Sequence, residues 1–206
     1  MPGPTLAVRS YGLDDVDQLL RIQRECFPPP FPPELWWKPE QLASHVFRFP
    51  EGALCVVIDG ELVASATCNR IDFDPAHPGH TWAEAADNGY LRNFDPGGDT
   101  LYGIDVAVRP AWRGKGIARA LYDARFAVVR RFGMKRFLAG SRMSGYHHHA
   151  DAMTPEAYAD EVVAGRLNDP VITPQLRAGL RPLSVVHDYL ADDEARNCAL
   201  LMEWTP

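Results

Sequence analysis

The chain has 206 residues and a formal net charge of −6, from 21 Lys and Arg against 27 Asp and Glu. Its length predicts one domain spanning residues 1–206, long enough to bury a sizeable core. The acidic balance argues against nucleic acid as the main partner, because phosphate backbones are bound by clustered positive charge. The sequence has no run of about 18 apolar residues and no signal-peptide pattern, so we expect a cytoplasmic protein without a membrane partner.

Four cysteines are scattered along the chain without the close pairs that metal and redox motifs use. They are Cys26, Cys55, Cys68 and Cys198. Cys55 and Cys68 fall in apolar, strand-like runs, which favours buried free thiols in a reducing compartment.

The first half of the chain is predicted to form two helices and three strands. The helices are 14–26, capped by Asp14 or Asp15, and 39–49; the strands are 6–9, 53–58 and 62–67. Asp59-Gly60 between two apolar runs is typical of a two-residue hairpin turn. Prolines in the segment 27–33 exclude regular helix there, and Trp36 and Trp37 follow at once. This aromatic loop either packs on the core or forms part of a substrate wall.

The second half is predicted to form a strand–helix–strand unit, two further helices and a closing hairpin. The strands are 101–108, 137–141, 183–189 and 198–204, and the helices are 117–132, 154–165 and 173–179. Gly133, Gly165 and Gly179 each end a helix. The segment 71–100 is rich in Asp, Pro, Gly and His and is predicted to be a long loop, of the kind that forms lids or binding surfaces. The element order predicts an α+β fold.

The glycine-rich turn after the central strand carries the strongest functional signal. Backbone N–H groups at the start of a helix, together with its positive partial charge, form a site for phosphate. Ile117 after Gly116 excludes the P-loop pattern, and Arg119 stands where the dinucleotide-binding pattern needs a third small residue. The remaining pattern, [Q/R]-x-x-G-x-[G/A], is filled by Arg113, Gly116 and Ala118. The alternative is a turn that merely joins strand to helix.

This strand–turn–helix unit resembles the coenzyme A site of the GNAT acetyltransferase superfamily, and the element order matches as well. The resemblance implies a GNAT-type fold, a central mostly antiparallel twisted sheet with flanking helices, and acetyl-CoA as cosubstrate without a metal. It also implies that turn amides bind the pyrophosphate and that the strand at 106–108 pairs with the pantetheine arm. The implied cofactor-binding residues are Val106, Ala107, Val108, Arg113, Gly114, Lys115, Gly116, Ile117, Ala118 and Arg119. For Lys115 and Arg119, plain solvated charge is the alternative.

Four further segments look like the acetyltransferase-like domain that is found fused to nitrilase-type amidohydrolases. They are Thr81-Trp82, Asn88-Gly89-Tyr90, Asp99–Gly103 and Ala139–Arg142. This likeness refines the expected fold more than the expected reaction, because the substrates of that group are poorly defined.

Acyl transfer to an amine needs a polarised thioester carbonyl, a neutral amine and a proton for the leaving thiolate. A backbone N–H near Val106 could polarise the carbonyl, and Asp105 could take the amine proton through water. Strand alternation puts these two residues on opposite faces, so Asp105 is either the base or an ordinary hydrogen-bonded carboxylate. Many GNAT enzymes use a tyrosine four residues before a Gly-Phe pair as the acid, and Gln175 stands there in this chain. Tyr146 or His147 could replace it, or the thiolate leaves without an acid.

Several histidines and one arginine have alternative interpretations. The segment His147–His149 has adjacent rather than spaced imidazoles, which zinc sites do not use, so no native metal is expected. His77 and His80 fall in the long loop and are expected at its surface. Arg142 ends a strand at the expected cleft, where it either pairs with a substrate carboxylate or forms a structural ion pair.

We therefore expect an N-acetyltransferase that moves an acetyl group from acetyl-CoA to a primary amine by direct attack in a ternary complex. Acetyl-CoA is expected between the strands 101–108 and 137–141. The acceptor, a small-molecule amine or a protein lysine, is expected on the side of Trp36, Trp37 and the long loop. A homodimer is compatible with this expected function. A non-catalytic acyl-CoA-binding or regulatory module is the alternative, because the usual tyrosine is missing.

Overall fold

A computed structural model describes residues 6–74 and 76–206, and the described strands form one seven-stranded sheet. The strand order is β1-β2-β3-β4-β5-β7-β6. The strands are β1 Leu6–Ser10, β2 Ala53–Ile58, β3 Glu61–Ile71, β4 Thr100–Val108, β5 Arg136–Arg142, β6 Arg181–Val186 and β7 Ala199–Trp204. Neighbouring strands are antiparallel except β4 and β5, which are parallel. The mostly antiparallel sheet with flanking helices confirms the expected α+β class.

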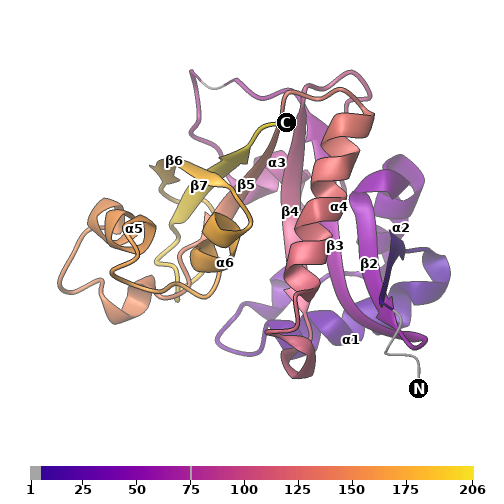
Figure 1. The fold of residues 1–206 in the computed structure, drawn as a ribbon, viewed down its shortest axis with the longest axis horizontal. Coiled ribbons are helices and arrows are strands. Elements are labelled where there is room, and N and C mark those ends of the chain that lie inside the picture. The colour runs from indigo at the N-terminus through magenta and orange to yellow at the C-terminus, as the bar shows by residue number, and fades with distance from the viewer. Residues whose placement is uncertain (1–5, 75) are drawn as a thin grey trace.

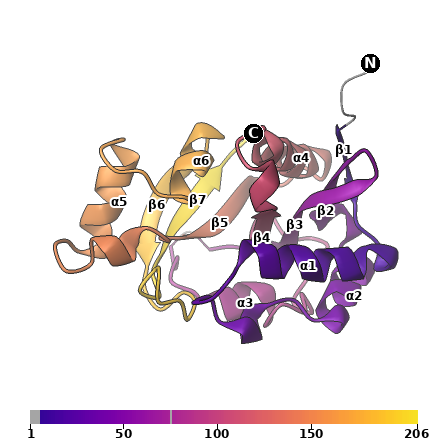
Figure 2. The same cartoon turned by 90° about the horizontal axis from the view of Figure 1, so that it is seen from below.

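Helices cover both faces of this sheet. They are α1 Val16–Cys26, α2 Pro39–Arg48, α3 Trp82–Ala86, α4 Ile117–Arg131, α5 Pro155–Val163 and α6 Ile172–Arg177. α4 and α6 lie on one face, while α1, α2 and α3 lie on the other (Figures 1 and 2). α5 lies outside the edge strand β6 and contacts both β6 and α6. The sheet is therefore the middle layer of three.

The central helix α4 shows how the sequence sets these layers. Ile117, Leu121 and Val129 lie on its inner side and are at most 1% exposed, so burying them holds the helix on the sheet. Gly133 follows the helix with φ +62°, a left-handed conformation that glycine adopts without steric strain. The predicted helix from 117 to 132 and its glycine stop are confirmed.

The segment 71–100, predicted as a loop, contains the short helix α3. The Thr81 hydroxyl accepts the Glu84 N–H at 3.1 Å, and the Glu84 carboxylate accepts the Thr81 N–H at 2.8 Å. This reciprocal capping box is a sequence pattern that would have predicted the helix. The bounds of the strand predicted at 183–189 are also wrong, because β6 ends at Val186 and Tyr189 lies beyond it.

β4 and β5 separate part-way along their length. They pair only between residues 100–103 and 136–139, although both strands continue further. The other edge of β4 pairs with β3 from Thr100 to Val108. The second half of β4 is therefore joined to the sheet on one side only, and its other edge has main-chain groups that do not pair with β5.

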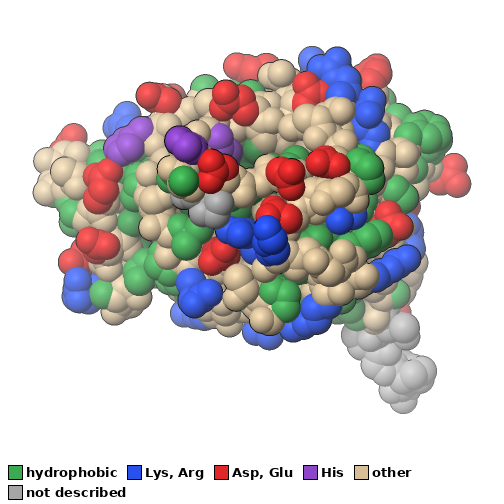
Figure 3. All heavy atoms as spheres, turned by 90° about the horizontal axis from the view of Figure 1, so that it is seen from above, with side chains coloured by type: hydrophobic (Ala, Val, Ile, Leu, Met, Phe, Trp, Pro, Cys, Tyr) green, Lys and Arg blue, Asp and Glu red, His purple; other side chains and the backbone are tan. Residues whose placement is uncertain are grey.

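The surface carries charges of both signs. Acidic and basic side chains are interspersed on the face drawn in Figure 3, in keeping with the small negative net charge.

The four cysteines are free thiols, and all but Cys26 are buried. Within residues 6–74 and 76–206, no helix has the length and apolar character needed to cross a bilayer.

Candidate active site

A cleft lies where β4 and β5 part. Its walls come from both edges of the opened sheet and from helices on both faces. The strands contribute Gly103–Val106 and Ala139–Arg142, the α1 side contributes Gln23, Phe27, Phe31, Leu35, Trp37 and Trp82, and the α4 side contributes Tyr122, Arg125, Val171 and Gln175. Tyr189 and Leu190 complete it. The cleft therefore connects the α4 face of the sheet with the α1 face.

The Asp105 carboxylate lies inside this cleft. Its Oδ2 accepts the Gln23 side-chain N–H at 2.9 Å and the Trp37 indole N–H at 3.3 Å. Burial raises the pKa of Asp105 to about 6, while the Trp37 bond, the Arg125 charge and the Gln23 bond limit the rise. A carboxylate with this pKa is ionised at neutral pH and basic enough to accept a proton.

Asp105 and Val106 line the cleft from opposite faces of the sheet, as strand alternation predicts. Asp105 contacts Gln23 and Trp37 on the α1 face, whereas Val106 packs with Ile117 and Leu121 of α4. Both residues line the cleft because it opens to both faces. A bulge in β4 precedes them, since β3 pairs Thr67 with Asp105 and Cys68 with Gly103 and Ile104 is left as the extra residue.

Arg125 is a cleft residue that sequence reasoning missed. Its side chain comes from α4 and is 1% exposed, and one Nη donates to the Asp105 carbonyl oxygen at 3.1 Å. Arg125 falls four residues after Leu121, on the inner side of the helix. A charged residue at an otherwise apolar helix position is the signal that could have found it.

Gln175, at the position of the usual tyrosine, also lines the cleft and is 4% exposed. Its side-chain oxygen accepts the Ser141 hydroxyl. An amide has no acidic proton at neutral pH, so Gln175 does not replace a tyrosine as proton donor. The cleft does contain a buried phenol, Tyr122, whose pKa is raised mainly by burial and which therefore keeps its proton.

Tyr146 and His147 are not brought to the cleft. The Tyr146 hydroxyl donates to the Met153 carbonyl at 3.0 Å, and its ring lies 5.4 Å from that of Tyr158. His147 Nδ1 lies 3.0 Å from the Ser144 carbonyl oxygen. These contacts hold both side chains outside the cleft, where they stabilise the local fold. In the described part of the chain, no cluster of three His, Cys, Asp or Glu is placed to hold a metal.

The glycine turn joins the end of β4 to the start of α4, and of the ten implied cofactor-binding residues only Val106 lines the cleft itself. Gly114 and Gly116 have φ +74° and +79°, which other residues adopt only with strain. The first helical bond runs from the Ala120 N–H to the Gly116 carbonyl at 3.1 Å, so the N–H groups of the first helical turn have no partner within α4. Free amides at a helix start fit a pyrophosphate, and the coenzyme A expected here would be held by them.

The basic side chains of the turn are exposed and have local partners. The Lys115 ammonium lies 4.5 Å from the centre of the Trp112 ring. Arg113 Nε donates to the Val108 carbonyl at 3.1 Å, and Arg119 pairs with Asp123 at 2.9 Å. These contacts hold three positive charges at the start of α4, where an anion would bind.

Arg142 lies at the cleft but is paired within the chain. Its guanidinium lies 2.5 Å from Asp192 and 3.2 Å from Glu194, and it stacks 4.9 Å from the centre of the Phe31 ring. Of the two interpretations, the geometry favours the structural ion pair. The two tryptophans have different roles. Trp37 lines the cleft, whereas the Trp36 indole N–H donates to the Phe27 carbonyl at 2.9 Å.

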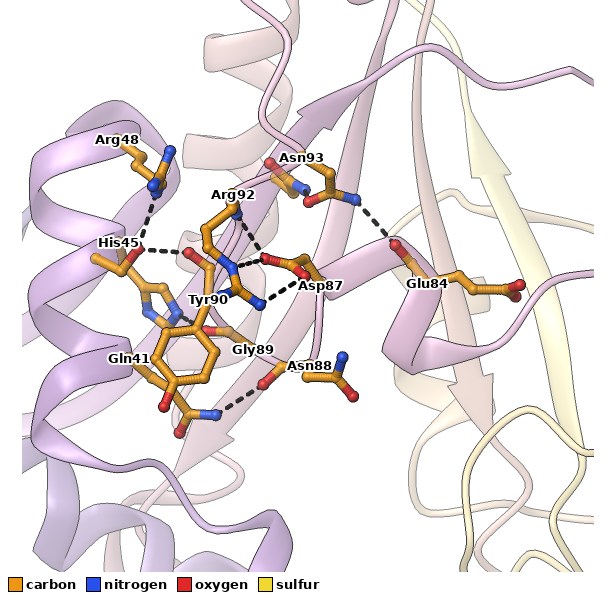
Figure 4. A network of polar contacts seen from close by, with 12 residues as sticks. Gln41, His45, Arg48, Glu84, Asp87, Asn88, Gly89, Tyr90, Arg92 and Asn93 are labelled. Atoms are coloured by element: carbon orange, nitrogen blue, oxygen red, sulfur yellow. Dashed lines mark hydrogen bonds and ion pairs between the residues drawn. The ribbon is translucent and has the colours of Figure 1, made fainter.

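A polar network ties α2 to the segment that carries Trp82 (Figure 4). His45 is 0% exposed and its Nε2 lies 2.7 Å from the Gly89 carbonyl oxygen, while Gln41 donates to the Asn88 carbonyl at 2.8 Å. Burial lowers the pKa of His45 to about 4. The Trp82 indole N–H in turn donates to the Ile104 carbonyl at 3.1 Å. This wall of the cleft is thus fixed by buried polar bonds.

The model of the GNAT acetyltransferase family matches residues 16–150. The chain belongs to this family. It is therefore an acyltransferase of the class that uses coenzyme A thioesters, as the resemblance implied. It is 43% identical over 199 residues to YkwB of Bacillus subtilis (strain 168), an N-acetyltransferase described as uncharacterized, covering 97% of this chain and 88% of that one.

Two other proteins extend the comparison. The chain is 37% identical over 200 residues to YhcX of Bacillus subtilis (strain 168), named a probable hydrolase, covering 97% of this chain but only 38% of that protein. Among solved structures, the GNAT-like decarboxylase GphF in complex with isobutyryl-CoA superposes with a TM-score of 0.81 at 22% identity, covering 97% and 98% of the two chains. At that identity the likeness shows the fold.

Proposed function

We propose that this protein transfers an acetyl group from acetyl-CoA to a primary amine, on a small molecule or a protein lysine, within a ternary complex. The observation that carries the proposal is the Asp105 carboxylate, with a pKa of about 6, beside the edge of β4 that does not pair with β5. We further propose that residues 1–206 act as one acyltransferase domain in the cytoplasm, where its free thiols would stay reduced.

The α4 face of the cleft is proposed to hold acetyl-CoA. The first-turn amides of α4 and the charges of Arg113, Lys115 and Arg119 would bind the pyrophosphate. The unpaired edge at Val106–Val108 would pair with the pantetheine arm as an added strand does. The acceptor would then approach from the opposite face, past Trp37 and Trp82.

The residues of the cleft have complementary roles in this reaction. Asp105 would take the proton from the amine nitrogen as that nitrogen bonds to the thioester carbon, and an N–H near Val106 would polarise the carbonyl. As the carbon–sulfur bond breaks, Tyr122 would donate its proton to the sulfur. Holding both substrates in one cleft supplies proximity, which can lower a barrier by up to about 7–11 kcal/mol.

The binding step is tested by thermal denaturation with coenzyme A. We expect coenzyme A to raise the Tm of the wild type and not that of Gly116→Glu, whose carboxylate would repel the pyrophosphate. Gly165→Glu is the matched control, because Gly165 has φ +73° and, like Gly116, open space around a Cβ. If coenzyme A gives no rise, or Gly116→Glu keeps it, the proposed site is wrong.

The chemical step is tested by thiol release from acetyl-CoA across a panel of primary amines and lysine peptides. Turnover on any of them supports the transferase. Binding of coenzyme A without turnover on every acceptor would instead favour an acyl-CoA-binding module, the function that the amide at Gln175 leaves open.

A further inference from the structure

The guanidinium of Arg125 is buried in the cleft, and one of its donors has no hydrogen-bond partner among the described residues. The side chain is 1% exposed, and its Nε has no hydrogen-bond partner in the described part of the chain. The bond from Nη2 to the Asp105 carbonyl is the one hydrogen bond recorded from its guanidinium to a main-chain oxygen there. A buried N–H donor without an acceptor raises the free energy of the folded state, so buried donors in native proteins nearly always have a hydrogen-bond partner.

Arg125 also lacks an ion pair. Within residues 6–74 and 76–206, no carboxylate lies within 4 Å of its guanidinium, and the Asp105 carboxylate, whose pKa the Arg125 charge lowers, acts on it only from beyond ion-pairing distance. The aromatic rings of Tyr122 and Phe137 lie 4.8 Å and 5.5 Å from the guanidinium. Arg142, in the same cleft, has two carboxylate partners. Since a buried charge is normally paired, the difference points to an anionic partner that comes from a ligand.

The partner is not the Asp105 side chain. Arg125 bonds the main-chain oxygen of Asp105, whereas the Asp105 carboxylate is bound by Gln23 and Trp37 from the α1 face. The two charged groups therefore serve opposite faces of the cleft, and Arg125 belongs to the α4 face.

The position of Arg125 along α4 identifies which part of a ligand it meets. Arg125 follows Gly116 by nine residues, which places it about 13.5 Å along the helix axis from the glycine turn. With the pyrophosphate at the turn and the pantetheine arm along β4, this depth corresponds to the thioester end of an acyl-CoA. The anion that reaches Arg125 would therefore belong to the acyl group and not to the acceptor.

We propose that Arg125 selects acyl-CoA donors whose acyl group carries a free carboxylate. The planar guanidinium can bind a carboxylate through two parallel hydrogen bonds, one of them from the unpartnered Nε. The inference rests on the proposed function for the location of coenzyme A, and it extends the donors from acetyl-CoA to acyl-CoA thioesters whose acyl group ends in a carboxylate.

Isothermal titration with matched acyl-CoA pairs tests this selection. Malonyl-CoA is compared with acetoacetyl-CoA, and succinyl-CoA with butyryl-CoA, so that each pair has similar size and differs in the carboxylate. For at least one pair we expect the charged member to bind roughly tenfold to a hundredfold more tightly, the range of a bond between charged groups. Equal or weaker binding of both charged members would overturn the proposal.

Two variants assign the preference to the side chain. Arg125→Met has a similar length without charge and should lose the preference, while Arg125→Lys keeps the charge without the fork and should retain only part of it. Arg131→Met, at an exposed position of the same helix, is the control and should keep it. A preference that survives in Arg125→Met would contradict the assignment.

Stability separates this role from a structural one. A buried guanidinium that has no ion-pair partner until a ligand binds destabilises the unliganded fold. Without ligand, the Tm of Arg125→Met should therefore be no lower than that of the wild type. A strongly lowered Tm would mean that Arg125 mainly holds the β4 bulge. If no acyl-CoA binds the wild type at all, the proposed function fails as a whole, whereas equal binding within the pairs fails only this inference.

Discussion

The indole N–H of Trp37 and the carboxylate of Asp105 lie 3.3 Å apart, although the two residues are 68 positions apart in the chain. Trp37 comes from the aromatic loop before α2, and Asp105 from the bulged part of β4. One side chain thus forms a wall of the cleft and also holds the proposed base. Any change in this bond should alter the proton affinity of Asp105, which makes it accessible to measurement.

Activity should follow the ionisation of Asp105. Because the carboxylate is the active form of a base and its pKa is about 6, the pH profile of kcat at saturating acceptor should have a rising limb with its midpoint near pH 6. kcat/KM is a poorer measure, because it also rises as the free amine loses its proton. Asp105→Asn should lower kcat by roughly 10²–10⁴-fold and remove the rising limb near pH 6. The measurement is the pH–rate profile of both proteins. A wild-type profile that is flat between about pH 5 and 8 would show that Asp105 is not the base.

Removing the Trp37 donor should shift this profile to higher pH. The bond stabilises the charged carboxylate, so Trp37→Phe raises the pKa of Asp105 above 6 and moves the rising limb in the alkaline direction. Trp36→Phe is the matched control, since its indole N–H holds a main-chain oxygen instead. It should leave the midpoint unchanged even if it destabilises the fold by about 1 kcal/mol. Identical midpoints for both variants would contradict the role of Trp37.

Asp105 should also lower the stability of the fold at neutral pH. Its pKa is raised on folding, so the folded state disfavours the charged form, and this contribution to stability falls as pH rises from about 4 to 6. Asp105→Asn should therefore raise the free energy of unfolding at pH 7 by up to about 3 kcal/mol and give no such gain below about pH 4. Urea denaturation of both proteins at pH 7 and below pH 4 measures this difference. A lower free energy of unfolding for Asp105→Asn at pH 7 would contradict the prediction.

The fold was largely predictable because its signals are local. The apolar spacing in α4, the Asp59-Gly60 turn and the glycines of the turn at 114–116 are each read within a few residues. The site was less predictable because its parts meet only in space. Nothing near Asp105 in the sequence indicates the bulge at Ile104, and nothing near Arg125 indicates that it faces an opening between two strands.

The proton donor depends on the same long-range contacts. Tyr146 comes four residues after β5, and its proximity in sequence predicts a place at the cleft, but the chain folds it away into contact with Tyr158. Tyr122, one α4 turn before Arg125, is the phenol that the cleft contains on that face. Its position within an apolar helix pattern is typical of a core residue, and only the separation of β4 from β5 gives it access to a ligand.

His45 should make the fold sensitive to acid. Its pKa is lowered to about 4 by burial, so the stability that it confers above about pH 6.5 is lost as pH falls toward 4. Asp105 acts in the opposite direction over nearly the same range, and the two effects partly cancel in the wild type. His45→Gln should therefore gain stability as pH falls from about 6 to 4, whereas Asp105→Asn should lose it. The same pH trend in both variants, measured by urea denaturation, would contradict this coupling.

Gly140 should be required for the position of Tyr189 at the cleft. A Cβ at residue 140 would overlap the Tyr189 ring, and that ring is held in turn by a 3.0 Å bond from Tyr189 to the Tyr102 hydroxyl. Gly140→Ala should therefore destabilise the fold by about 1–3 kcal/mol, the range for overpacking in a core. Tyr189→Leu in the same chain should recover part of that loss, since it removes the ring that the methyl group meets. Gly12→Ala, with open space around its Cβ, is the control and should change stability little. Strictly additive effects of Gly140→Ala and Tyr189→Leu on the free energy of unfolding would show that the two positions do not interact.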